Sequence, residues 1–126
     1  MTLMVCLPND EDLAGDVLES AASLTSELKG DMVVVHVFPR GSAHPPEHQR
    51  LAEEAHAASW YLESDTPAEA IVGFARTRRV THVLFGPVAW KRWGKPISDI
   101  ATATGVLALL WVLTGSVFGA SVEFPE

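Results

Sequence analysis

The amino-acid sequence predicts an α/β fold: a single doubly wound domain with helices on both faces of a parallel sheet. Several short segments are almost purely apolar, which is typical of strands buried on both faces. Segments with apolar residues at helical spacing alternate with them, as in sheets with helical crossovers. The 126 residues are enough for one hydrophobic core but not for two. We therefore predict one domain over residues 1–126.

The N-terminal part of the chain begins this alternation. The apolar run Leu3–Leu7 predicts a first buried strand. Asp10 is expected to cap the helix that follows, and Gly30 is a natural stop for that helix. The second strand is predicted over Met32–Phe38, which is apolar except for one histidine.

The middle of the chain continues with a loop, a helix and a strand. Two prolines and a glycine in Gly41–Pro46 predict a loop. The alanine-rich segment Glu47–Ala58 predicts a helix, and Ser59–Glu63 a short third strand. Thr66–Glu69 has the pattern of a capping box with proline at the first helical position, so a further helix should start there.

The C-terminal part is predicted to complete the sheet. Thr81–Phe85 is the expected fourth strand, and Lys95–Thr104 a short helix that starts at its proline. Val106–Leu113 is the expected fifth strand, and Ser116–Phe124 a sixth strand at the edge of the sheet.

Composition excludes several classes of protein. The formal net charge of -7 argues against general binding to nucleic acid or to an anionic membrane. Cys6 is the single cysteine, so no internal disulfide forms, and its apolar strand predicts an inert buried thiol. The N-terminus lacks a signal-peptide pattern, and the longest apolar stretch is too short to span a bilayer. We therefore expect a cytoplasmic protein without membrane insertion.

Positive charge is concentrated in one segment of this acidic chain. Six of the nine basic residues lie between positions 76 and 95, where there is no Asp or Glu. Such a segment can bind an anion locally while the whole molecule repels polyanions. The six are Arg76, Arg78, Arg79, Lys91, Arg92 and Lys95.

Several motifs together resemble one known family. The segment 79–86 reads Arg-Val-Thr-His-Val-Leu-Phe-Gly and is followed by Arg92 and Trp93. The second strand contains Val33–Val37, and the first ends in Cys6–Leu7. In order and spacing these motifs resemble the universal stress protein superfamily over about positions 3 to 113. They look closest to the stress-protein-like sensor domain of KdpD-type histidine kinases.

The resemblance implies a fold and a role. We expect a five-stranded parallel sheet in the order 3-2-1-4-5, with ligands bound beyond the carboxyl ends of the strands. It also implies a non-catalytic regulatory or sensor domain in stress or in ion and osmotic signalling. A homodimer is expected, with a membrane kinase or transporter as a candidate partner.

The phosphate-binding motif of the ATP-binding members is degenerate here. Gly86 matches their glycine after the fourth strand, but Ala89 replaces the second glycine. Ser98 lies near the place of their later Gly-Ser, and Pro8 replaces their aspartate at the end of the first strand. ATP or another adenine nucleotide is therefore a candidate ligand only if the basic residues hold its phosphates by charge.

We accordingly predict one ligand site and neither a catalytic nor a metal site. Gly86, Lys91, Arg92 and Lys95 are expected to bind a phosphate, with Trp93 stacking on a base. The predicted ligand-binding residues are Pro8, Asn9, His36, Val37, Gly86, Lys91, Arg92, Trp93, Lys95 and Ser98.

The cluster Trp90-Lys91-Arg92-Trp93 has three interpretations that the sequence leaves open. It can bind a nucleotide as above, or it can dock a protein, since Trp and Arg are enriched in interaction hot spots. In the third interpretation one indole covers the core and the charges face water.

Other sites are less favoured. A phosphorylated receiver would need a lysine after the fifth strand, and none follows Lys95. His44, His48 and His56 are expected to be solvated surface residues rather than metal ligands. An enzyme such as a nucleotide hydrolase is least expected, because common catalytic motifs are absent.

Two non-catalytic hypotheses therefore remain. The first is the ligand-binding sensor domain. The second is a nucleotide-independent module for protein interaction and dimerisation, with Val106–Leu113 as the dimerising strand. In that case the tail after Leu113 either leaves the strand open or covers its edge and keeps the protein monomeric.

Overall fold

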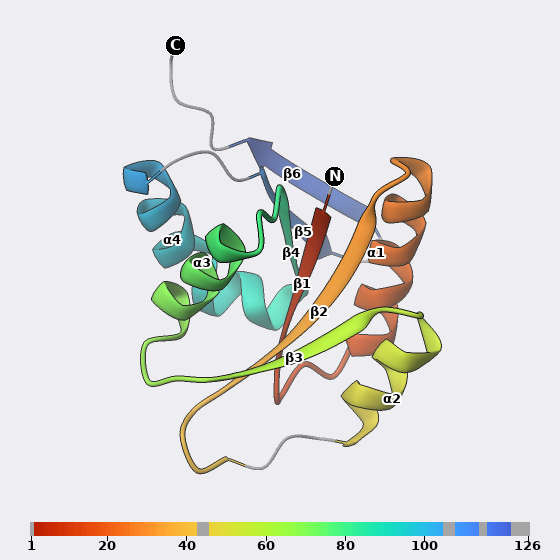
Figure 1. The fold of residues 1–126 in the computed structure, drawn as a ribbon, viewed down its shortest axis with the longest axis horizontal. Coiled ribbons are helices and arrows are strands. Elements are labelled where there is room, and N and C mark those ends of the chain that lie inside the picture. Colours follow the sequence, from red (N-terminus) through yellow and green to blue (C-terminus); the bar gives the residue numbers. More distant parts are fainter. Residues whose placement is uncertain (1, 43–45, 105–107, 114–115, 122–126) are drawn as a thin grey trace.

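The computed structural model describes residues 2–42, 46–104, 108–113 and 116–121. Strands and helices alternate along the chain, as the apolar patterns predict (Figure 1). The elements are β1 (Thr2–Pro8), α1 (Ala14–Glu27), β2 (Asp31–Phe38), α2 (Pro46–Glu54), β3 (Ala58–Glu63), α3 (Pro67–Thr77), β4 (His82–Phe85), α4 (Pro87–Thr104), β5 (Ala108–Leu113) and β6 (Ser116–Ser121).

The strands form one sheet in the order β3-β2-β1-β4-β5-β6. β1 lies between β2 and β4 and pairs in parallel with both, so its residues have a strand on either side. The α/β class and the order of the first four strands confirm the prediction. β5 pairs in parallel with β4, whereas β6 returns antiparallel to β5, so the sheet is mixed at this edge.

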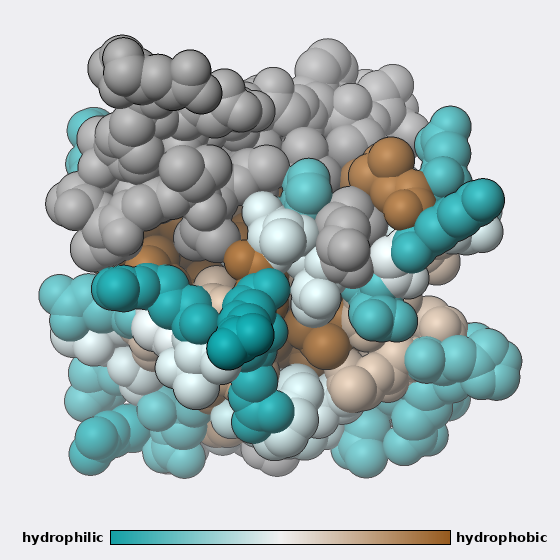
Figure 2. All heavy atoms as spheres, turned by 45° about the horizontal axis from the view of Figure 1, so that its top comes forward, coloured by the Kyte–Doolittle hydropathy of each residue, from teal (hydrophilic) through white to brown (hydrophobic). Residues whose placement is uncertain are grey.

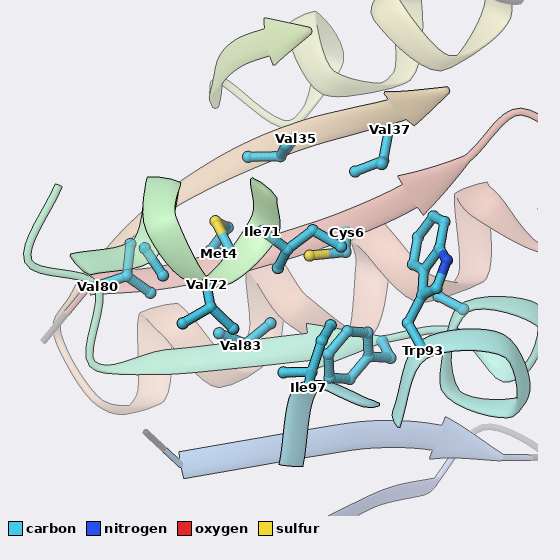
Figure 3. Close-up of a cluster of buried hydrophobic side chains, with 13 residues drawn as sticks. Met4, Cys6, Val35, Val37, Ile71, Val72, Val80, Val83, Trp93 and Ile97 are labelled. Carbon is cyan, nitrogen blue, oxygen red and sulfur yellow. The ribbon is translucent and has the colours of Figure 1, made fainter. Parts of the chain in front are cut away.

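Helices cover both faces of the sheet (Figure 1). On one face α1 and α2 pack their apolar residues, such as Val17 and Ala52, against Val5 of β1. On the other face α3 and α4 bury Ile71 and Ile97 against the opposite side of the sheet (Figure 3). Because both faces are covered, the central strands need apolar side chains at every position, which explains their continuous apolar runs.

Cys6 lies in this second layer. Its side chain is fully buried, and desolvation by burial raises the pKa of the thiol. A thiol that stays protonated is a poor nucleophile. The prediction of an inert buried cysteine is confirmed.

The predicted start of the last helix is wrong. α4 begins at Pro87, directly after β4, and Pro96 lies inside it rather than at its start. Proline at the first helical position loses no hydrogen bond, whereas an internal proline costs one. Ala89, Trp93 and Ile97 recur every four residues and are buried against the sheet, and this packing outweighs the cost at Pro96. The basic segment between the fourth strand and Lys95, for which no helix was predicted, is therefore the first half of α4.

Two predicted helix caps are also wrong in detail. α1 begins at Ala14 after Leu13, without a side-chain cap, so Asp10 does not cap it. Thr66 does precede α3 and Pro67 is its first residue, but the side-chain bond of a capping box is not made. Both helices are held instead by the apolar residues that they bury.

The second helix is shorter than predicted. α2 ends at Glu54, because His56 adopts a left-handed backbone with φ of 56° and Ala57 bonds back to the carbonyl of Ala52. This closes the helix in the usual left-handed manner and lets β3 start at Ala58. Parts of the predicted loop and of the last two strands, at 43–45, 106–107 and 122–124, lie outside the described residues, as does His44.

Polar side chains cover much of the described surface in one view of the molecule. In Figure 2 teal residues project from this surface, and brown residues show mainly between them. Among the described helices, none combines the length and apolarity that a membrane span requires. The end of the sheet where β1 and β2 finish carries the cavity described next.

Candidate functional site

A cavity of about 320 Å³ lies beyond the carboxyl ends of β1 and β2. Such crevices are the usual ligand sites of open parallel sheets. The volume falls within the range of about 300 to 1,000 Å³ that is typical of small-molecule sites. Its lining comes from the ends of β1 and β2, the start of α3 and the first half of α4: Asn9, Asp10, Val37, Phe38, Pro39, Ser42, Pro67, Arg92 and Trp93.

Trp93 forms an apolar wall of this cavity. Only 7% of its surface is exposed, and it belongs to the core layer under α3 and α4. Figure 3 shows its indole at the end of that layer where β1 and β2 finish, on the same side as Val37. The ring therefore packs in the core and also lines the cavity, so only a small part of its surface is accessible to a ligand.

Asp10 and Arg92 form a pair across the rim of the cavity. The guanidinium donates to both carboxylate oxygens, at 3.0 Å and 2.6 Å. The side-chain hydrogen bond from Arg92 lowers the pKa of Asp10, and the same bond raises the pKa of Arg92. Both side chains are about half exposed, so the pair adds little stability, but its forked geometry orients both groups.

Glu11 is buried beside this pair, at the N-terminus of α4. Only 2% of its surface is exposed, and its Oε2 accepts a hydrogen bond from the backbone N–H of Ala89 at 3.4 Å. The residue before α4 is Gly86, which has no side chain to act as a cap, and Pro87 has no N–H to be capped. Glu11 therefore supplies the N-terminal cap of α4 from a turn 78 residues earlier.

Gly86 makes room for this carboxylate. A Cβ atom at position 86 would lie 2.5 Å from Oε2 of Glu11 and 2.8 Å from Val17. Among the described glycines only Gly41 has a positive φ, so position 86 needs glycine for space rather than for its backbone angles. The glycine that the sequence matches to a phosphate-loop residue here contacts a carboxylate of the same chain.

Burial raises the pKa of Glu11, and nearby acidic groups contribute to the rise while the N–H groups of Val88 and Ala89 oppose it. Its Oε1 is buried and makes no hydrogen bond within the described part of the chain. A carboxylate with one uncompensated buried oxygen is costly to ionise. The backbone N–H groups at the N-terminus of α4 are therefore the main groups that favour the charged form of Glu11.

Two histidines support the turn that carries Glu11. His48 of α2 is 6% exposed, and its Nε2 lies 3.2 Å from the backbone oxygen of Glu11. The ring of His36 stacks between those of His48 and Tyr61, with centroids 6.0 Å and 4.9 Å away. The prediction that His48 is solvated is wrong, because α2 turns it toward the sheet. His56 is exposed as predicted.

The basic residues expected at one site point to different sides of α4. Arg92 lines the cavity, whereas Lys91, Lys95 and Ser98 line a separate surface hollow with Trp90. Lys95 also pairs with Asp99 at 3.3 Å. Because Arg92 lines one hollow and Lys91 and Lys95 line the other, the predicted phosphate-binding residues do not share one cavity.

The predicted ligand-binding residues thus divide into three groups. Asn9, Val37, Arg92 and Trp93 line the cavity. Pro8 in β1, His36 in β2 and Gly86 after β4 do not line it, and the other three line the surface hollow.

Sequence reasoning missed Asp10, Glu11, Phe38 and Ser42. Asp10 and Glu11 followed a strand directly, which was the signal that could have placed them at the crevice, but acids at that place are also common at the start of a helix. Within the described residues, no group of three or more His, Cys, Asp or Glu side chains is arranged to hold a metal ion.

Comparison with known proteins shows which fold this is. No family model and no curated protein matches the sequence. A universal stress protein from Archaeoglobus fulgidus in complex with dAMP superposes with a TM-score of 0.58 at 18% identity, over 90% of this chain and 98% of the other. A universal stress protein in complex with cAMP gives 0.58 at 13%, over 89% and 97%. The chain therefore has the fold of the universal stress proteins.

The contact between Gly86 and Glu11 predicts non-additive mutations. Gly86→Ala should destabilise the protein by about 1–3 kcal/mol, because its Cβ overlaps the carboxylate. In a Glu11→Ala background the same change should cost at least about 0.5 kcal/mol less. Urea denaturation of the four proteins measures this. Gly73→Ala, in α3 with open space around it, is the control and should not destabilise. Additive effects would contradict the contact.

The raised pKa of Glu11 predicts how stability changes with pH. Folded Glu11 holds its proton more tightly than unfolded Glu11, so its contribution to stability falls as pH rises from the ordinary value of 4.5 through the raised pKa. The difference in unfolding free energy between wild type and Glu11→Gln should therefore decline as the pH rises above about 4. Asp10, whose pKa is lowered from 3.8, is present in both proteins and cancels. A difference that grows with pH would contradict the assignment.

Proposed function

We propose that this protein is a non-catalytic regulatory domain of the universal stress protein type that binds an adenine nucleoside or nucleotide in the cavity beside Trp93. The observation that carries the proposal is the position of this cavity, beyond β1 and β2 at the carboxyl end of the sheet. Two proteins of the same fold were crystallised with dAMP and with cAMP.

The chemistry of the lining supports a ligand with a flat apolar part and a polar part. Val37, Phe38 and Trp93 offer apolar and aromatic surface to a base. Asn9 and Ser42 carry hydrogen-bonding groups, and the Asp10 carboxylate is an acceptor that Arg92 holds in place. A few polar groups around an apolar pocket are the usual means of orienting a small ligand.

A non-catalytic role is part of this proposal. The charged groups of the cavity are Asp10 and Arg92, which are hydrogen-bonded to each other, and its lining within the described residues contains no histidine, cysteine or lysine. A general base or nucleophile would need a partner that activates it. Signalling through a kinase or transporter, in the manner of KdpD-type sensor domains, is the regulatory output that we propose.

The proposal predicts saturable binding of adenosine or adenine nucleotides. Ser42→Trp should reduce the affinity at least about tenfold, because an indole at the rim fills the cavity that the ligand needs. Ser23→Trp, at an exposed position of α1 away from the cavity, should bind like the wild type. Isothermal titration calorimetry with adenosine, AMP and cAMP measures this. If none of the three binds the wild type, the proposed ligand class is wrong.

A second candidate is the dimerisation module, which one observation favours. β3 is an outer strand of the sheet and exposes Trp60 and Tyr61, each to 38%. The guanidinium of Arg78 lies 3.9 Å from the centre of the Trp60 ring. Aromatic residues and arginine on a strand edge are suited to pairing with a second copy. β5, the strand first considered for dimerisation, pairs with β6, which is the alternative in which the tail covers its edge.

This candidate predicts self-association that depends on Trp60. Light scattering should give a dimer mass for the wild type at high micromolar concentration, and Trp60→Lys should shift it to the monomer. Leu28→Lys replaces another exposed apolar residue, at the end of α1, and should leave the mass unchanged. A wild-type monomer at every concentration would argue against the module.

A further inference from the structure

The positive end of α4 is already occupied by a negative group of the chain itself. The N-terminus of an 18-residue helix carries a partial positive charge and uncapped N–H groups, which is the arrangement that binds phosphates in many proteins. Here the carboxylate of Glu11 accepts from Ala89 at that end. The carboxylate is 2% exposed and is not a surface group that moves aside freely.

The carboxylate also takes the space that a phosphate would need. It lies within 2.7 Å of the place where a single Cβ on Gly86 would be. A site that does not accept one methyl group beside Glu11 does not accept a phosphate there. The glycine that permits close approach to the backbone is therefore used by Glu11 and not by a ligand.

The other charged groups near the cavity do not supply a net positive charge that would attract a phosphate. Arg92 donates hydrogen bonds to both carboxylate oxygens of Asp10, so the cavity lining carries one negative and one positive group that neutralise each other. Lys91 and Lys95 face the other hollow. Asp10, Glu11 and Asp12 follow one another at the crevice, and a phosphate would approach this acidic turn against like charge.

We propose that Glu11 is an internal substitute for a ligand phosphate, and that the cavity selects an uncharged nucleoside over its phosphorylated forms. The choice of a nucleoside rests on the proposed function, whereas the occupation of the α4 end by Glu11 does not. Like charge and filled space discriminate against the wrong ligand, as in other sites that reject a close analogue.

The first arm of the test compares ligands on the wild-type protein. Calorimetry with adenosine, AMP and ATP should give an affinity for adenosine at least about tenfold above that for ATP. Tighter binding of AMP or ATP would overturn the proposed selectivity. If none of the three binds, the nucleoside ligand and the proposed function both fail, and the second arm still tests Glu11.

The second arm asks whether removal of Glu11 creates a phosphate site. Inorganic phosphate should raise the melting temperature of Glu11→Ala by several degrees above a chloride control of equal ionic strength. It should not do so for the wild type or for Glu11→Gln, whose side chain still fills the space. Glu19→Ala, an exposed position in α1, has the same change of net charge and should not respond. Glu11→Ser, with a hydroxyl that can still cap the helix, replaces Glu11→Ala if the latter does not fold.

The phosphate experiment on the Glu11 variants can fail independently of the comparison of adenosine, AMP and ATP. Equal stabilisation of wild type and Glu11→Ala by phosphate would mean that Glu11 does not block an anion site. No stabilisation of either Glu11→Ala or Glu11→Ser would mean that the α4 end does not bind phosphate even when it is vacant. Either result would overturn the role of Glu11 as a phosphate substitute.

Discussion

The contact between Glu11 and the first turn of α4 is the constraint on which this end of the molecule depends. Gly86 and Pro87 leave the helix without a cap of its own, and Glu11 provides one from the turn after β1. Because β1 and β4 are neighbours in the sheet, this contact joins the turn after β1 to the helix after β4, and both of these border the cavity. His48 holds the same turn from the other side through the backbone of Glu11.

A charged group used in this way changes what the crevice can bind. The end of α4 would otherwise be the natural place for a phosphate, and its positive potential is already offset by Glu11. Asp10 does the same to Arg92 at the rim, so an apolar cavity with balanced charge remains beside Trp93. The two solved structures with this fold hold dAMP and cAMP, each of which contains a phosphate. We therefore expect this protein to bind a ligand without contacts from α4 to a phosphate.

Part of the candidate site was predictable and part was not. The loops after β1 and β2 were correctly expected to border a crevice, since parallel strands place their carboxyl ends together, and Asn9 and Val37 line the cavity. The basic cluster was misjudged because a helix was predicted only from Lys95 onward, whereas Ala89, Trp93 and Ile97 have helical spacing. In the helix, Lys91 and Lys95 line a different hollow from the one that Arg92 lines.

The sequence by itself determined the α/β class and the positions of the first four strands. Strands buried on both faces must be apolar throughout, and that requirement is visible without knowledge of any contact. Only the tertiary structure decided which groups the two acids contact. Asp10 pairs with Arg92, and Glu11 accepts a hydrogen bond from Ala89, each about 80 positions away along the chain. A local pattern of acids reads as the start of a helix. The adjacency of β1 and β4 instead makes it the cap of a distant one and the boundary of the cavity.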